Sequence, residues 1–131
     1  MMKKNLYAFI IALLIVGCSS SKGSSTGDSS ANSVDETYGY SEKNAIKVGG
    51  FEQGPKNERD YLNSLTGPNG EPVSFTRKGS CCQFKTANSP YGMGMLDMYR
   101  VSYQGKKDTV LLYINMYDKG KLKAPKGFIM K

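Results

Sequence analysis

Cys81 and Cys82 are the residues of this chain with the most evident chemistry, because they are adjacent thiols. Two thiols in an oxidising compartment normally pair, but adjacent Cα atoms lie only about 3.8 Å apart, closer than is usual in a disulfide. In a strand the two side chains would also point to opposite faces. Pairing therefore requires a bent backbone, which Gly79 can help to provide.

Three states of this cysteine pair are compatible with these constraints. In the first, the thiols stay reduced and at least one packs as a small apolar side chain. In the second, they form a strained vicinal disulfide that fixes a turn. In the third, they are a redox switch or bind a soft metal such as Cu(I) with Met93, Met95 or Met98. The sequence leaves the three open, and we predict no resident metal or other cofactor.

Histidine is absent from the chain, which removes several kinds of active site. Neither a Ser–His–Asp triad nor a Cys–His pair can form, and no phosphate-binding or dinucleotide-binding glycine motif is present. Residues of types common in active sites occur without diagnostic spacing at Arg59, Asp60, Tyr61, Arg77 and Arg100. The sequence therefore favours a domain without catalytic residues.

A third cysteine, Cys18, follows an apolar segment near the start of the chain. Lys3 and Lys4 precede the apolar run from Leu6 to Val16, and the small residue Gly17 comes directly before Cys18. These are the three parts of a secretory signal peptide. The apolar run is too short to span a bilayer, which takes about 20 residues, so the segment predicts export.

The segment from Leu14 to Cys18 resembles the lipobox of bacterial lipoproteins. The resemblance implies diacylglycerol on the Cys18 sulfur, cleavage after Gly17 and acylation of the new amino terminus. Several acyl chains anchor a protein stably, since each buried methylene contributes about 0.8 kcal/mol. We therefore expect a lipid-anchored envelope protein, the alternative being a secreted protein in which Cys18 is incidental. Ser19 stands where an inner-membrane protein often has aspartate, which favours the outer membrane, facing the periplasm.

The remaining chain divides into a tether and one domain. Residues 19–37 are rich in serine and glycine, with Val34 as their only large aliphatic residue. Such a segment cannot bury enough apolar surface to fold, so it predicts a flexible linker. Residues 38–131 suffice for one modest core. The predicted organisation is a signal peptide with its lipobox cysteine (1–18), a linker (19–37) and a single globular domain (38–131).

The domain is predicted to contain one helix and several strands. The helix spans 57–65, with Asn57 as its cap and an apolar stripe of Tyr61, Leu62 and Leu65. Strands are predicted over 45–48, 73–77, 81–84, 96–103, 109–117 and 128–130. One helix with a small antiparallel sheet of four to six strands is an α+β domain.

Basic residues exceed acidic ones, and the formal net charge of the chain is +7. Five lysines close the sequence with no acidic residue among them: Lys119, Lys121, Lys123, Lys126 and Lys131. Such a segment is typical of a solvated face, although it can also meet anionic lipid or a polyanionic glycan. We expect contact with a membrane through the anchor, and an envelope protein or glycan as partner. Nucleic acid is not expected, since no motif for it is present.

Several motifs of the domain occur together as a set. They are Asn57-Glu58-Arg59, Tyr61-Leu62-Asn63, Gly67-Pro68-Asn69-Gly70-Glu71, Gly79-Ser80-Cys81-Cys82, Leu112-Tyr113-Ile114-Asn115-Met116-Tyr117 and Ala124-Pro125-Lys126-Gly127-Phe128. The set resembles that of small lipoproteins from Bacteroidetes-type bacteria. Similar sequences are often labelled 2-dehydro-3-deoxyphosphooctonate aldolase, which joins phosphoenolpyruvate to arabinose 5-phosphate.

The aldolase label implies a (β/α)₈ barrel of about 250 residues, whereas the residues of this chain predict a small domain with one helix. The interpretation that fits the residues is therefore a non-catalytic binding or scaffolding domain. The alternatives are the aldolase, and a thiol-redox or soft-metal role for Cys81 and Cys82.

Overall fold

The structure is a computed structural model that describes residues 35–131. Cys18, the signal peptide and all but the end of the predicted linker lie outside the described residues. The elements in chain order are η1 (Glu42–Asn44), β1 (Ile46–Lys47), η2 (Phe51–Gln53), α1 (Gly54–Asn63), β2 (Leu65–Thr66), β3 (Val73–Lys85), β4 (Met93–Tyr103), β5 (Val110–Asn115) and β6 (Ile129–Met130). Within residues 35–131, no helix combines the length and apolar character needed to cross a membrane.

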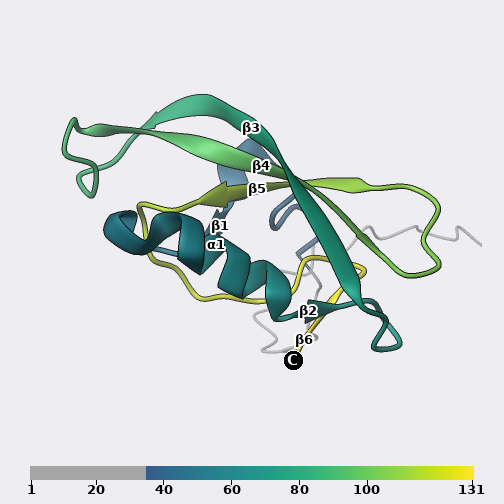
Figure 1. Cartoon of the computed structure of the whole chain (residues 1–131). Helices are drawn as coiled ribbons and strands as arrows, with labels where there is room; N and C mark the ends of the chain where they lie inside the picture. Colours follow the sequence, from purple (N-terminus) through teal and green to yellow (C-terminus); the bar gives the residue numbers. More distant parts are fainter. Residues whose placement is uncertain (1–34) are drawn as a thin grey trace, which may run out of the picture. The chain divides into compact units, whose positions relative to one another are not determined.

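The strands form one sheet of four strands and one of two. The larger sheet has the order β1-β5-β4-β3, with β3, β4 and β5 antiparallel and β1 parallel to β5. The smaller sheet pairs β2 with β6. Helix α1 lies across one face of the larger sheet (Figure 1). The predicted α+β class, with one helix and a small sheet, is confirmed. The larger sheet is mixed rather than wholly antiparallel, because β1 joins β5 in the same direction.

Helix α1 begins earlier than the sequence predicts. It starts at Gly54 instead of Asn57 because Pro55 lies in its first turn, where the missing N–H of proline removes no helical hydrogen bond. Asn57 therefore does not cap the helix. Its Nδ2 donates to the backbone oxygen of Gly49 at 2.9 Å and so fixes the loop that precedes α1.

Strand β3 is one long strand, whereas the sequence predicts two separate ones. It pairs with β4 along its whole length, and the register shifts at Lys78 and again at Cys82. At each position β3 has one residue without a partner on β4, which is the pattern of a β-bulge. The two bulges let the strand continue through the glycine and the cysteines, which in the sequence interrupt the alternating pattern.

The core lies between α1 and the larger sheet. Its buried apolar residues are Tyr38, Ile46, Val48, Tyr61, Leu62, Leu65, Tyr99, Val101, Leu112, Ile114 and Phe128. The parallel pairing of β1 with β5 brings Ile46 beside Ile114, and both are fully buried. On each strand the next residue, Lys47 or Asn115, points to the opposite face of the sheet.

The last part of the chain is held against the core by tyrosine hydroxyl groups. The Tyr61 hydroxyl donates to the Lys123 carbonyl at 2.8 Å, and the Tyr40 hydroxyl donates to the Lys126 carbonyl at 2.6 Å. These bonds fix the segment that leads to β6, although it contains little regular structure.

Candidate functional site

Cys81 and Cys82 form a disulfide at the second bulge of β3, with their Cα atoms 3.7 Å apart. Cys82 has a φ of 63°, and no other non-glycine residue of the described part has a positive φ. This left-handed conformation breaks the strand alternation that would send the two side chains to opposite faces. The bend lies at Cys82 itself, whereas Gly79 follows the other bulge. Of the three states that the sequence leaves open, the structure contains the vicinal disulfide.

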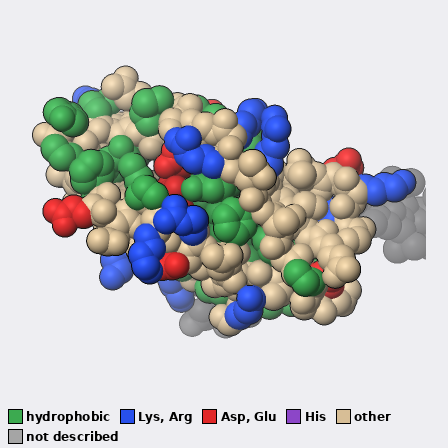
Figure 2. All heavy atoms as spheres, in the orientation of Figure 1, with side chains coloured by type: hydrophobic (Ala, Val, Ile, Leu, Met, Phe, Trp, Pro, Cys, Tyr) green, Lys and Arg blue, Asp and Glu red, His purple; other side chains and the backbone are tan. Residues whose placement is uncertain are grey.

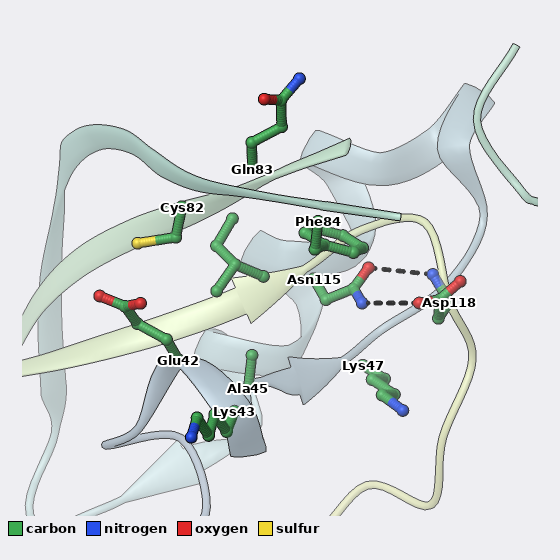
Figure 3. A pocket seen from close by; sticks show the side chains of 10 residues that line it. Glu42, Lys43, Ala45, Lys47, Cys82, Gln83, Phe84, Asn115 and Asp118 are labelled. Atoms are coloured by element: carbon green, nitrogen blue, oxygen red, sulfur yellow. Dashed lines mark hydrogen bonds between the residues drawn. The ribbon is translucent and has the colours of Figure 1, made fainter. Parts of the chain in front are cut away.

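The disulfide borders a cavity of about 360 Å³. The cavity lies on the face of the sheet that α1 does not cover, since Lys47 and Asn115 line it. Its lining residues are Glu42, Lys43, Ala45, Lys47, Cys82, Gln83, Phe84, Leu96, Asn115 and Asp118. Figure 3 shows Glu42 and Cys82 facing each other at one end, with Asn115 and Asp118 at the other. Met93, Met95 and Met98, the methionines that the sequence offers as soft metal ligands, do not line this cavity.

Glu42 brings a carboxylate to the two sulfur atoms. One of its oxygens and both Sγ atoms all lie within 4.8 Å of one another. The residue sits in η1, where the backbone N–H of Lys43 donates to the Ser41 hydroxyl at 3.3 Å. The Glu42 side chain is exposed, and the ion pairs of residues 35–131 do not include it. Its carboxylate is therefore available to bind a ligand at the sulfurs.

Asp118 closes the other end of the cavity. It accepts hydrogen bonds from the Thr86 hydroxyl at 2.6 Å, from Asn88 Nδ2 at 2.8 Å and from Asn115 Nδ2 at 3.0 Å. Burial opposes ionisation of Asp118, but these hydrogen bonds outweigh it and lower its pKa. Asp118 therefore stays ionised and ties the β3–β4 loop to the end of β5.

A second polar cluster, which the sequence analysis missed, lies inside the core under α1. Glu58, only 1% exposed, accepts a hydrogen bond from the Tyr99 hydroxyl at 2.7 Å. Asp97, 6% exposed, accepts hydrogen bonds from Arg77 Nη2 at 2.7 Å and from the Ser80 hydroxyl at 2.8 Å. The cluster thus joins α1 to both β3 and β4.

The carboxyl groups of Glu58 and Asp97 influence each other's ionisation. Glu58 Oε1 has no hydrogen-bond partner among the described residues, and a proton on Glu58 lets it donate to a neighbouring carboxylate. Burial raises the pKa of Glu58 to about 8, and Asp97 adds to the rise. Burial also opposes ionisation of Asp97, but the hydrogen bonds from Glu58, Arg77 and Ser80 outweigh it and lower the pKa of Asp97. At neutral pH a neutral acid therefore faces a carboxylate.

An acid beside a carboxylate is also found in catalytic sites, but the surroundings of this pair favour a structural role. Neither carboxyl group lines the cavity at the disulfide or any of four other hollows on the surface of residues 35–131. A general acid must reach the atom that it protonates, and both groups face protein instead. The pair therefore fastens α1 to the sheet.

The five residues of catalytic type that the sequence contains do not form a site. Arg59, Asp60 and Arg100 are exposed and Tyr61 is buried in the core. Arg77 alone joins the cluster at Asp97. The sequence does hold one signal for Glu58, because it precedes Tyr61 by three residues and Leu62 by four and so shares their face of the helix. Glu42 gives no such signal, as it lies far from the cysteines along the chain.

The lysines at the end of the chain are partly neutralised. Lys123 lies 3.6 Å from Asp35, and Lys126 pairs with Glu36. The other three, Lys119, Lys121 and Lys131, are exposed and form no ion pair with residues 35–131. This arrangement is compatible with the solvated face that the sequence favours.

Comparisons of the chain with protein-family models, with curated proteins and with solved structures find no match. The described residues alone therefore define the class: a small α+β domain with a disulfide-closed bulge beside a surface cavity.

Proposed function

We propose that this chain is a lipid-anchored protein of the bacterial cell envelope, whose α+β domain binds a partner and does not catalyse a reaction. The disulfide between Cys81 and Cys82 is the observation that carries the proposal. Disulfides persist in oxidising compartments such as the periplasm and are rare in the cytosol. The bond therefore supports the export that the leader and Cys18 predict. Cys18 supplies the anchor, and Ser19 favours the outer membrane, facing the periplasm.

An apolar surface at one end of the domain supports the binding role. Tyr91, Met95 and Phe51 are 89%, 46% and 39% exposed, and the Phe51 ring stacks on Tyr117 at 5.3 Å. Hydrophobic side chains gather at this end in Figure 2, where Figure 1 places the β3–β4 loop and the start of α1. Contiguous exposed apolar surface is typical of interaction sites. The partner we propose is an envelope protein, with an envelope glycan as the alternative.

The fold gives the aldolase alternative no support. Residues 35–131 form one α-helix and six strands, whereas that activity belongs to a barrel with eight helices. Purified chain incubated with phosphoenolpyruvate and arabinose 5-phosphate should release no phosphate above the level of a heat-denatured control. Release that depends on both substrates would contradict a non-catalytic role.

Photo-cross-linking in intact cells tests the binding role. A photoreactive amino acid at position 91 should capture a defined envelope protein. The same probe at Gln104, an exposed residue in the turn between β4 and β5, is the matched control and should not capture it. Met95→Asp should reduce capture from position 91, because it places a charge on the apolar surface. Identical products from both positions, or none from position 91, would contradict the proposal.

A further inference from the structure

We propose that Cys81 and Cys82 in their reduced form, together with Glu42, bind a thiophilic divalent cation of the Zn²⁺ or Cd²⁺ type. This site lies on the sheet face away from α1 and does not depend on the partner-binding role. From the sequence, a soft-metal role of the two cysteines is one alternative, with methionines as further ligands. Glu42 is not among those ligands, because it meets the cysteines only through the fold.

The geometry brings three metal-ligating atoms together from two elements. The Glu42 oxygen and the two sulfur atoms all lie within 4.8 Å of one another. In this structure the two sulfurs are bonded to each other, so reduction must first let them separate. Two thiolates of adjacent residues can then each approach one ion at about 2.3 Å, and the Glu42 oxygen at about 2.0–2.2 Å. Glu42 can move because its side chain is exposed and takes part in none of the ion pairs of residues 35–131.

The cavity of about 360 Å³ provides the remaining coordination position. Cys82 and Glu42 both line it, and they face each other across its end (Figure 3). A cation held between them would have one side open to the cavity, where a water molecule can complete a tetrahedral shell.

The donor set determines the class of cation. Thiolates select Zn²⁺, Cu(I) and similar soft or borderline ions, whereas Mg²⁺ and Ca²⁺ prefer oxygen ligands. Two thiolates and one carboxylate carry three negative charges, which favours a divalent ion over a monovalent one. We therefore expect Zn²⁺ and Cd²⁺ to bind and Mg²⁺ to fail.

Binding requires prior reduction of the disulfide by a dithiol. The reductant attacks one sulfur through its thiolate, forms a mixed disulfide and then closes its own disulfide. It gives up two electrons and two protons, and Cys81 and Cys82 become thiols. The cation then displaces both thiol protons to solvent as two metal–sulfur bonds form. In the oxidised form the sulfurs are bonded to each other and offer no thiolate, so the site is closed.

A cadmium titration tests this site. The full chain would carry Cys18→Ser, so that Cys81 and Cys82 supply the only thiols. After reduction with a phosphine and removal of the phosphine without oxygen, Cd²⁺ is added and the thiolate-to-cadmium charge-transfer band is followed in the ultraviolet. The band should saturate at one equivalent of Cd²⁺ and release two protons. The oxidised chain, measured in the same way, should show neither signal.

Glu42→Gln separates the three-ligand site from a simple pair of thiols. It should weaken Cd²⁺ binding by at least about tenfold, since groups that merely contact metal ligands cost 10- to 100-fold when removed. Glu52→Gln, which alters an exposed acid on η2, is the matched control and should leave the affinity unchanged. Equal affinity of the two variants would overturn the assignment of Glu42. Binding by the reduced chain no tighter than by the oxidised chain would overturn the site altogether.

Discussion

Cys82 keeps a backbone conformation that is unfavourable for any residue with a side chain. Its φ of 63° lies in the left-handed region, where an L-residue loses about 1–2 kcal/mol. The covalent bond to Cys81 holds the residue there, because the two sulfurs can meet only while the bulge persists. Glycine tolerates the same φ without this cost.

The two cysteines can be replaced in ways that test this account of the bulge. The double variant Cys81→Ser with Cys82→Gly should be more stable than the double variant Cys81→Ser with Cys82→Ser. We expect its free energy of unfolding to be higher by about 1 kcal/mol. Both variants lack the disulfide, so the difference reports the backbone at position 82. Urea unfolding measures it. A serine variant as stable as the glycine variant would show that position 82 does not hold a left-handed conformation.

Glu58 makes the stability of the domain depend on pH. Its pKa is about 8 in the folded protein, against 4.5 for the unperturbed group. Because the folded state keeps the proton that the unfolded state loses, stability is complete below about pH 4.5 and falls as the pH rises through 8. The other carboxyl group of the pair, Asp97, has a lowered pKa and so adds stability above its unfolded pKa.

Glu58→Gln should remove the loss of stability that the wild type shows as the pH rises. The glutamine amide can donate to Asp97 and accept from the Tyr99 hydroxyl, as the protonated acid does. At pH 5 the variant and the wild type should be similar in free energy of unfolding. At pH 8 the variant should be more stable by about 4 kcal/mol, at about 1.4 kcal/mol per pKa unit. Parallel pH profiles of the two proteins would contradict the raised pKa.

Elements of the fold could be predicted where local chemistry determines them. The two β-rich runs predicted over 96–103 and 109–117 correspond to β4 and β5, which pair as a hairpin. Gly105 in the turn between them has a positive φ of 88°. Helix α1 was predicted with its start misplaced, because Pro55 is as compatible with a first turn as with a break. Long-range pairing was not predictable: β1 meets β5 in parallel through contacts between segments far apart in the chain.

In the candidate site, too, features local to the sequence could be predicted, whereas contacts between distant segments could not. The bulge at Cys82 gives no periodic signal, since a single unpaired residue only interrupts the alternation. The adjacency of Cys81 and Cys82 is visible in the sequence and marks both as candidates. Their approach to Glu42, and that of Asp97 to Glu58, depends on the packing of separate elements. Residue types could therefore be recognised in the sequence, but their partners could not.

Asp118 is the residue on which the connection between the β3–β4 loop and β5 depends. Asp118→Ala removes three hydrogen bonds and should lower the free energy of unfolding by about 1–3 kcal/mol. Amide hydrogen exchange should also become faster in residues 86–92. Asp108→Ala, at an exposed position in the β4–β5 turn, is the control and should change neither. Unchanged exchange in Asp118→Ala would contradict the proposed connection.

At the scale of the whole molecule, we propose that the domain works at a membrane through an anchor at Cys18. The described residues contribute the disulfide, which fits an oxidising compartment, and an apolar surface at one end. The segment before Cys18, which resembles a lipobox, predicts export and acylation. Together these features support the proposed place outside the cytoplasm.

Labelling with radioactive palmitate tests whether Cys18 carries the proposed lipid anchor. Cells producing the chain should incorporate the label into it, and the protein should fractionate with membranes, because several acyl chains together give stable anchoring. The Cys18→Ala variant should take up no label and leave the membrane fraction. An unlabelled wild-type chain, or a variant that fractionates as the wild type does, would contradict the anchor and with it the proposed place of action.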